Sequence, residues 1–225
     1  MIKIKLFVLL SLFCVSNIYS QWPNQNPVPE GNDLWSTYFI DDNNGWIVGS
    51  DGFIKRTTNS GLDWIQQNSG TNVILKSVQF SNLNTGWICG EDGIILKTKD
   101  GGLNWFLLTS GTNQDLTNIH FCDLNNGFAV GYSGTILKTT NGGSSWTIQP
   151  SGTASDLFGL DFVDNNVGYV VGGLDQTLES YAILKTTDGA ESWLRKPLPD
   201  GYTYWSSLNT VEFVDANTGW IGIGY

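Results

Sequence analysis

Two short segments of this sequence combine aromatic side chains with carboxylates, the residue types that recognise sugars and peptides. One segment lies within residues 173–182 and the other around residues 199–205. Aromatic rings bury large apolar areas and carboxylates accept hydrogen bonds, so together they suit a glycan or a polypeptide ligand. The candidate binding residues are Asp175, Glu179, Tyr181, Tyr202, Tyr204 and Trp205. The competing interpretation is that these are ordinary longer loops with some aromatic rings turned inward.

Catalysis in these segments would require two carboxylates at a set separation, as glycoside hydrolysis does. Asp175, Glu179 and Asp200 are the local candidates. Most other carboxylates, such as Asp41, stand in predicted turns, where hydrogen bonding to nearby backbone explains them. The single histidine, His120, alternates with apolar residues and is interpreted as a channel or surface residue rather than a base. The sequence shows no metal-ligand cluster and no phosphate-binding loop, so no cofactor is expected.

Both segments are insertions into a repeat. Four copies of an eight-residue box, from Thr to Trp, span residues 57–64, 98–105, 139–146 and 186–193. A second marker, Gly followed by an aromatic residue, recurs in phase at positions 45, 86, 127, 168 and 219. The last interval is ten residues longer than the other three, because six residues are added between Gly172 and Ile183 and four between Trp193 and Phe213. A fixed period of this kind indicates an array of one small structural unit.

Each repeat unit is predicted to form four short strands. In the third copy, alternating apolar residues predict strands A at 116–121, B at 127–131 and C at 135–140, with strand D starting near Trp146. Asn, Asp and Gly residues stand in the intervening turns. Four strands in about 41 residues is the size of a β-propeller blade, so the predicted fold is all-β. Successive strands run in opposite directions, which places both insertions on one face and every box on the other.

The box residues are predicted to have a structural role. Their hydroxyl and amide or carboxylate groups would hold the C–D turn, and the Trp would fill space between blades. The boxes consist of Thr57, Asn59, Gly61 and Trp64; Thr98, Asp100, Gly102 and Trp105; Thr139, Asn141, Gly143 and Trp146; and Thr186, Asp188 and Trp193, with Ala190 in place of the glycine.

The pattern Ser/Thr-x-Asp-x-Gly-x-x-Trp resembles the Asp-box, or BNR repeat, of sialidase-type propellers. The longer run Gly-x-Ile-Leu-Lys-Thr-Thr-Asn-Gly-Gly-x-x-Trp is more similar to repeats of the photosystem II stability/assembly factors, which also occur in secreted bacterial proteins. The resemblance covers about residues 34–225 and implies a propeller of roughly seven blades. Four blades and half of a fifth are present, so the sequence is expected to be a fragment of a longer protein. Gln21 to Asp33 could supply a ring-closing strand.

The resemblance leaves several functions open. Sialidases hold their substrate with three arginines, whereas this chain offers principally Arg56 and Arg195, so sialidase activity is not expected. The primary hypothesis is a non-catalytic module that binds or scaffolds an unknown protein or glycan. The first alternative is part of a secreted glycoside hydrolase, because xyloglucanase-like propellers carry similar boxes. The second alternative is a role in photosystem II assembly.

Residues 1–20 are typical of a secretory signal peptide, with Lys3 and Lys5 ahead of an apolar stretch and Ser20 before the predicted cleavage point. Cys14 would also permit a lipoprotein signal, although Phe13 is bulkier than such sites require. We therefore expect a secreted or cell-surface protein without a transmembrane anchor in this chain. Loss of the two lysines would move the net charge from −10 to −12, and such a surface repels nucleic acid.

Cys89 and Cys122 are the cysteines that remain after cleavage. They stand at non-equivalent positions in successive repeats, so the sequence permits a disulfide without implying one. Two small buried residues are the preferred interpretation.

Overall fold

A computed structural model of the chain describes residues 31–175, 180–197 and 207–224. Within these residues the protein is all-β, with eighteen strands, two short 3-10 turns and no α-helix. No helix in this part of the chain is long and apolar enough to cross a membrane. The predicted signal peptide and most of the N-terminal segment lie outside the described residues.

The strands form four four-stranded antiparallel sheets and one two-stranded sheet, each with its strands in sequence order. The first sheet contains β1 (Leu34–Phe39), β2 (Gly45–Gly49), β3 (Ile54–Thr57) and β4 (Ile65–Gln67). The second contains β5 (Leu75–Phe80), β6 (Gly86–Gly90), β7 (Ile95–Thr98) and β8 (Phe106–Leu108). The third contains β9 (Leu116–Phe121), β10 (Gly127–Gly131), β11 (Ile136–Thr139) and β12 (Thr147–Gln149). The fourth contains β13 (Leu157–Phe162), β14 (Gly168–Asp175), β15 (Ser180–Thr186) and β16 (Leu194–Arg195), and the fifth β17 (Ser207–Phe213) and β18 (Gly219–Gly224).

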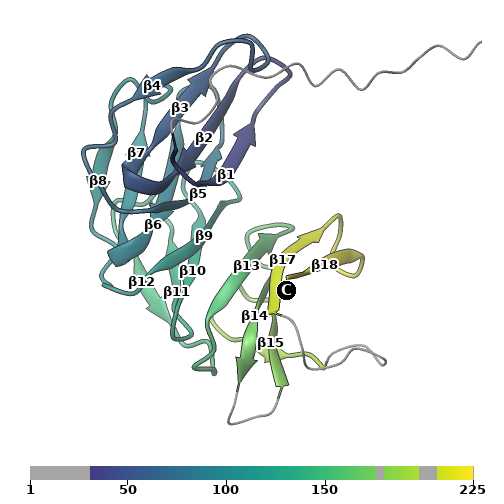
Figure 1. Cartoon of the computed structure of the whole chain (residues 1–225). Helices are drawn as coiled ribbons and strands as arrows, with labels where there is room; N and C mark the ends of the chain where they lie inside the picture. Colours follow the sequence, from purple (N-terminus) through teal and green to yellow (C-terminus); the bar gives the residue numbers. More distant parts are fainter. Residues whose placement is uncertain (1–30, 176–179, 198–206, 225) are drawn as a thin grey trace, which may run out of the picture.

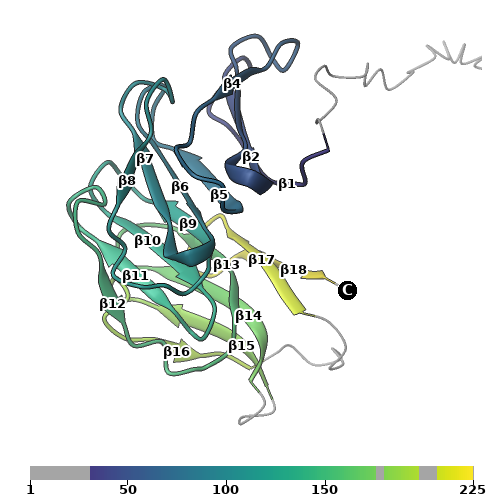
Figure 2. The ribbon, with the colours of Figure 1, turned by 60° about the vertical axis from the view of Figure 1, so that its left-hand side comes forward.

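The sheets follow one another around a common centre, as the blades of a propeller do (Figures 1 and 2). The first strand of each blade lies innermost: β5 contacts β1 and β9, and β13 contacts β9 and β17. The fourth strands, β4, β8, β12 and β16, lie outermost and are largely exposed. The predicted all-β propeller with four-stranded blades is therefore confirmed.

Stacked aromatic rings hold neighbouring blades together. Trp46 of β2 lies flat on Phe80, the last residue of β5, with ring centroids 3.5 Å apart. The box Trp of the second blade, Trp105, meets the same Phe80 edge-on at 5.9 Å. Each later blade repeats the arrangement, so one phenylalanine side chain joins the second strand of one blade to the box of the next. This packing buries the large rings that the sequence repeats with the period of the blade.

The six-residue insertion in the fourth blade is mainly strand rather than loop. β14 and β15 are longer than their equivalents, and Leu174 pairs with Tyr181 and Asp175 with Ser180 beyond an irregularity in the register. The added residues therefore extend the hairpin between the second and third strands. The second insertion lies mostly outside the described residues.

Cys89 is buried, Cys122 is half-buried, and both are free thiols. Burial raises the pKa of Cys122 to about 12, with nearby Asp123 and Asp164 adding to the effect. Neither cysteine forms the disulfide that the sequence left open.

Candidate functional site

The boxes form a repeated turn that is held by side-chain hydrogen bonds. In the second blade the Thr98 hydroxyl accepts hydrogen bonds from the backbone N–H groups of Asp100 and Gly102 and donates one to the Asp100 carboxylate. The Asp100 carboxylate in turn accepts the N–H of Asn104. The same bonds recur in the boxes that begin at positions 57, 139 and 186. The side-chain oxygens of the boxes therefore make their hydrogen bonds within the turn itself.

Backbone conformation explains the glycine of the box. Gly61, Gly102 and Gly143 have φ between 81° and 92°, a region that favours residues without a Cβ. Ala190 occupies the same position in the fourth box at φ 70°. The substitution noted in the sequence is therefore accommodated without a change of turn.

The loops divide between two faces as the strand directions require. On one face, the box turns form hydrogen bonds with the turns that join the first and second strands of a blade. In the second blade, for example, the Gly101 N–H donates to the Asn84 carbonyl. On the opposite face, the turns between second and third strands bond to the connections between blades, as when Gly134 N–H donates to Ser155 O. We call this second face the insertion face, because the lengthened β14–β15 hairpin turns there.

The predicted binding residues are only partly within the described structure. Glu179, Tyr202, Tyr204 and Trp205 lie outside the described residues, and for Asp175 only the backbone is described, at the end of β14. Tyr181 is 5% exposed and packs in a core cluster with Tyr169, Leu208 and Val211. Its side chain is therefore part of the core between the fourth and fifth units.

A central cavity opens at the starts of the innermost strands. It has a volume of about 550 Å³. Four of the five innermost strands start at the insertion-face end of their blades with a Leu, and the residues that follow face this cavity; β17 has the equivalent Leu as its second residue. The lining residues are Trp35, Ser36, Lys76, Ser77, Thr117, Asn118, Tyr132, Phe158, Ser207 and Asn209. We call these residues the channel mouth.

One repeat position supplies half of the channel mouth. The residue that directly follows the strand-initial Leu, or Leu208 in β17, differs in every unit. It is Trp35, Lys76, Thr117, Phe158 and Asn209 in turn. The preceding Leu is buried in the four later units, with exposures of 3% or less. The framework thus repeats while the side chain presented to the cavity changes.

Three aromatic side chains, Trp35, Tyr132 and Phe158, line the channel mouth. Trp35 is 52% exposed and Tyr132 is 37% exposed. Tyr132 meets Phe158 edge-on with ring centroids 6.3 Å apart. Exposed rings of this kind, surrounded by hydroxyl and amide groups, are typical of sites that hold a ligand by both apolar contact and hydrogen bonds.

The charge of Lys76 is neutralised within the wall of the cavity. Its ammonium group lies 3.0 Å from the Asp115 carboxylate and 3.4 Å from that of Glu91. Burial alone would lower the pKa of Lys76, but the hydrogen bond and charge of Asp115 outweigh burial and raise it. The ammonium also lies 4.9 Å from the centre of the Tyr132 ring. Lys76 therefore contacts two carboxylates and the ring of Tyr132 at the channel mouth.

Deeper in the channel, side chains link neighbouring innermost strands. The Gln79 side chain accepts the N–H of Phe121 and donates to its carbonyl, and Asp161 accepts the N–H of Phe213. His120 Nδ1 lies 3.6 Å from Asp161 Oδ1. Burial lowers the pKa of His120, and the nearby Asp161 charge only partly offsets it. These residues satisfy backbone groups of the innermost strands, which have a partner strand on one side only.

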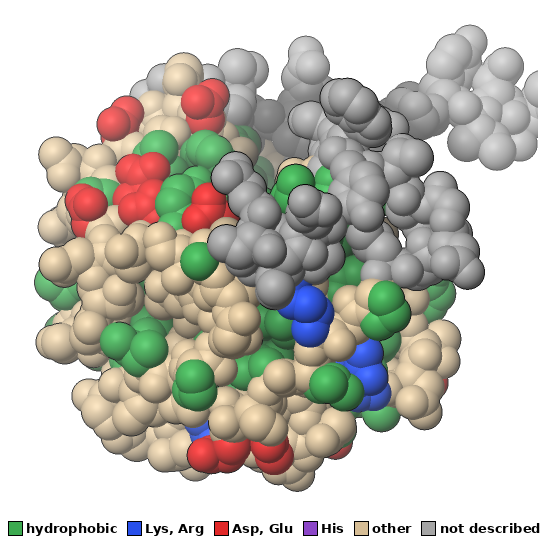
Figure 3. Space-filling view, turned by 90° about the horizontal axis from the view of Figure 1, so that it is seen from below, with side chains coloured by type: hydrophobic (Ala, Val, Ile, Leu, Met, Phe, Trp, Pro, Cys, Tyr) green, Lys and Arg blue, Asp and Glu red, His purple; other side chains and the backbone are tan. Residues whose placement is uncertain are grey.

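Figure 3 shows the insertion face from below. Asp and Glu side chains gather in separate groups toward its margin, and hydrophobic side chains are exposed between them. No group of His, Cys, Asp and Glu residues with the geometry of a metal site occurs in the described part of the chain.

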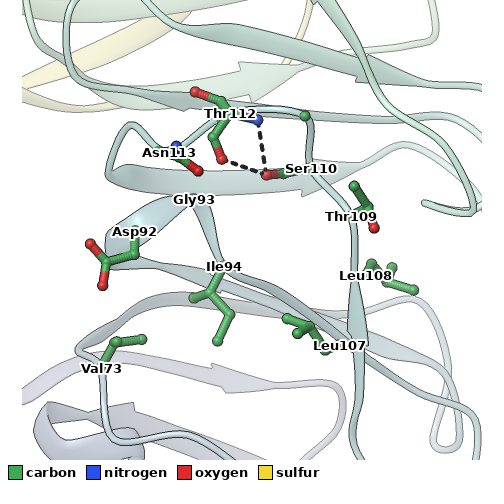
Figure 4. Close-up of a pocket in the computed structure, with 11 residues that line it drawn as sticks. Val73, Asp92, Gly93, Ile94, Leu107, Leu108, Thr109, Ser110, Thr112 and Asn113 are labelled. Carbon is green, nitrogen blue, oxygen red and sulfur yellow. Dashed lines mark hydrogen bonds between the residues drawn. The ribbon is translucent and has the colours of Figure 1, made fainter.

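Two other cavities belong to the repeat. Figure 4 shows one of about 410 Å³ beside the second blade, where the Ser110 hydroxyl donates to the Thr112 carbonyl. The same bond occurs at Ser69 and Ser151, so this turn follows each of the first three blades. A third cavity, of about 320 Å³, lies at the box of the third blade beside Glu191.

The sequence analysis missed the channel mouth. Its signal was present, because the residue after the Leu varies while the Leu itself and the Phe that ends the strand repeat. The insertions change the spacing of the repeat, whereas this position changes its side chain at constant spacing.

Comparison with known proteins identifies the repeat. The family model for Photosynthesis system II assembly factor YCF48 matches residues 15–114. No curated protein sequence matches this chain significantly.

Solved structures with low sequence identity share the fold. A structure described as YCF48 bound to D1 peptide is 17% identical, covers 87% of this chain and 91% of its own, and has a TM-score of 0.50. The WD40 β-propeller domain of Doa1 is 16% identical over 85% of this chain and 62% of its own, with a TM-score of 0.65. The GH74 xyloglucanase from Xanthomonas campestris is 12% identical over 81% of this chain and 34% of its own, with a TM-score of 0.63. The chain is a β-propeller protein, and its residues 15–114 are similar to the BNR repeats of the photosystem II assembly factor YCF48.

Proposed function

We propose that this propeller is a non-catalytic binding module that holds an extended segment of a protein partner at the channel mouth. The observation that carries the proposal is the variation of one repeat position. The five units present Trp35, Lys76, Thr117, Phe158 and Asn209 to a single cavity, each next to a repeated Leu. Variation at a position that faces a cavity favours recognition of a specific ligand over a structural role.

The chemistry of the cavity favours a polypeptide. Ser36, Ser77 and Asn118 supply short polar groups that can bond main-chain amides, while the rings of Trp35 and Phe158 can hold apolar side chains. Lys76 is already paired with two carboxylates, which argues against an anionic ligand held by this lysine. The structure described as YCF48 bound to D1 peptide is consistent with a propeller of this repeat type accepting a peptide.

The same cavity argues against the glycoside hydrolase alternative. None of the described residues that line it is an Asp, Glu or His. Asp115 and Glu91, the carboxylates that contact Lys76 in the cavity wall, are paired with that lysine, and Asp115 also accepts the backbone N–H of Asp92. A glycosidase would need two carboxylates free to act on either side of a sugar.

Selection from a displayed peptide library on the purified chain tests the binding proposal. Enriched peptides should bind the unaltered chain, and Trp35→Ala or Phe158→Ala should weaken them by roughly tenfold or more, as loss of a buried aromatic anchor does. Phe106→Ala is the matched control, since Phe106 is 58% exposed on the outermost strand β8 and should leave binding unchanged.

Two results would contradict the proposal. One is enrichment of peptides whose binding is the same for the Trp35→Ala, Phe158→Ala and Phe106→Ala chains. The other is that no peptide is enriched, while the chain binds or cleaves polysaccharides on a glycan panel. The second result would favour the glycan and hydrolase alternatives.

We also propose that the protein is exported to the cell surface or beyond. Support comes from the cationic and apolar composition of residues 1–20. The mass of the mature protein from a cell that expresses the complete sequence tests this proposal.

A further inference from the structure

One cavity of the second blade has an apolar lining. It is the cavity of about 410 Å³ drawn in Figure 4, and its apolar lining residues are Val73, Ile94, Leu107 and Leu108. The side chains of Val73, Ile94 and Leu107 point toward one another (Figure 4). Leu107 is 71% exposed, so this apolar surface is open to a ligand. We call the cavity the second-blade pocket.

The apolar lining is particular to this blade, although the turn beside it belongs to the repeat. The Ser-Gly-Thr sequence at residues 69–71, 110–112 and 151–153 is the same in three blades, whereas the lining positions change. The equivalents of the four apolar residues are Asn32, Phe53, Gln66 and Gln67 in the first blade, and Gln114, Thr135, Ile148 and Gln149 in the third. Apolar side chains gathered around a cavity with a few polar groups at its rim are typical of a binding site.

The second-blade pocket lies on the insertion face, next to the channel mouth. Asp92 lines the pocket from the 3-10 turn Glu91–Gly93, which joins the second and third strands of the blade. The Asp92 N–H donates to the Asp115 carboxylate, and Asp115 pairs with Lys76, which lines the channel mouth. One hydrogen bond and one ion pair therefore connect the rim of the pocket to the rim of the channel mouth.

The charge at this rim is negative. Among the described residues, the exposed Asp92 carboxylate has no hydrogen-bond or ion-pair partner, whereas those of Asp115 and Glu91 are paired with Lys76. In Figure 4 the Asp92 carboxylate points away from the apolar side chains. The turns and connections of the same face contain no lysine or arginine in residues 50–53, 68–74, 91–94, 109–115, 132–135 and 150–156. A positively charged side chain is therefore the group that complements Asp92.

We propose that the second-blade pocket is a second subsite for the extended partner segment held at the channel mouth. The segment crosses the second blade, places a lysine or arginine over Asp92 and inserts an apolar side chain between Ile94 and Leu107. This inference rests on the proposed function, because the channel mouth supplies the first anchor. Two anchors on one chain bind more tightly than either alone, since the second binds at a high effective concentration.

A polypeptide is the occupant that fits the pocket and its rim together. It can carry an apolar and a cationic side chain a few residues apart. A neutral polysaccharide supplies neither group, and a small apolar molecule would leave Asp92 unpaired. Thr109 and Asn113, which are exposed at the rim, offer polar groups to the main chain of the segment.

Peptides selected on the full 225-residue chain test the proposal, with affinities measured by isothermal titration calorimetry. Peptides that Phe158→Ala weakens are the ones that use the channel mouth. The tightest of these should lose about tenfold or more in affinity with Leu107→Asp, which places a charge in the pocket. Ile148→Asp is the matched control, because Ile148 has the same repeat position in the third blade, is 64% exposed and should leave the affinity unchanged. Circular dichroism verifies that each variant is folded.

The charge of Asp92 is tested separately. Asp92→Asn should weaken the same peptides about two- to fivefold, as loss of an exposed ion pair does, and high salt should remove the difference. Asp51→Asn is the matched control, since Asp51 has the same turn position in the first blade, with φ 56° against 55° for Asp92. Asp51→Asn should change the affinity less than Asp92→Asn does.

Shortened peptides show whether one segment reaches both sites. A peptide cut back to the residues that respond to Phe158→Ala should bind more weakly, and equally to the unaltered and Leu107→Asp chains. Peptides that respond to Phe158→Ala but bind the Leu107→Asp and Ile148→Asp chains equally overturn this inference and leave the channel mouth as a site. Peptides that respond to Leu107→Asp and not to Phe158→Ala contradict the proposed function and also overturn a single segment across both sites.

Discussion

At the scale of the residue, the box shows how one side chain can determine a turn. Thr186 accepts the N–H groups of Asp188 and Ala190, and the Asp188 carboxylate accepts the N–H and the hydroxyl of Ser192. Oxygen acceptors thus satisfy the backbone donors that a tight turn leaves free. Asn at the same position of the first and third boxes makes the equivalent bond through its amide oxygen.

The charge of Asp188 should make the stability of the fourth box depend on pH. The hydrogen bond from the Ser192 side chain and the bond from its N–H lower the pKa of Asp188 from 3.8 to about 2. A carboxylate whose folded pKa is lowered stabilises the fold above its unfolded pKa, and this contribution is lost as pH falls through the folded value. Asp188→Asn keeps the bonding pattern of the first and third boxes without a titrating group. The difference in unfolding midpoint between the unaltered chain and this variant should therefore shrink as pH falls from near 4 to near 2.

Urea unfolding at several pH values measures this difference. Asp42→Asn is a suitable control, because Asp42 is exposed and has no hydrogen-bond partner among the described residues. A difference between the unaltered chain and the Asp188→Asn variant that is the same near neutral pH and near pH 2 would contradict the assignment.

At the scale of the element, a blade is stabilised by its neighbours. Phe128 of β10 is 1% exposed and lies on Phe162 of the next blade, 3.7 Å between centroids. Its blade would expose both faces if it stood alone, as small repeats do. The junction is therefore the unit of stability in this fold.

Removing a stacked ring from a junction should lower the free energy of unfolding far more than removing an exposed ring from an outermost strand. Phe128→Ala deletes a buried aromatic side chain and should lower the free energy of unfolding by about 3–5 kcal/mol. Phe106→Ala, on the exposed outer strand, should change it by about 0.5 kcal/mol or less. Equal unfolding midpoints for the two variants in urea would show that the stack is not what stabilises the junction.

At the scale of the whole molecule, the blades curve until strands from the first and fifth units line one cavity. Trp35 of β1 and Asn209 of β17 are 174 positions apart in the sequence and both face the channel mouth.

Export would alter the whole molecule by removing residues 1–20. We expect a mature protein that begins at Gln21, because Ser20 provides the small residue required before the cut and the preceding stretch is apolar. Intact mass and N-terminal sequencing measure this directly. A protein recovered with residues 1–20 attached would rule out cleavage at this site.

The repeat made most of the fold predictable. Box and Gly-aromatic markers at constant spacing place the strands to within one or two residues, as with residues 116–121 and β9. Strand alternation also assigned each loop to its face. The length of the β14–β15 hairpin was not predicted, because Leu174 and Tyr181 carry no local turn signal that distinguishes a longer ladder from a longer loop.

The sequence by itself determined the four-stranded blade, its period, the boxes that hold its turns and the place where the spacing changes. These features are local, since each depends on residues within one repeat and on hydrogen bonds over a few positions. Only the tertiary structure decided that Trp35, Lys76, Thr117, Phe158 and Asn209 share a cavity and that Tyr181 is buried. The physical reason is curvature: how many blades surround the centre, and how closely, depends on the packing of rings between blades, which no single repeat contains.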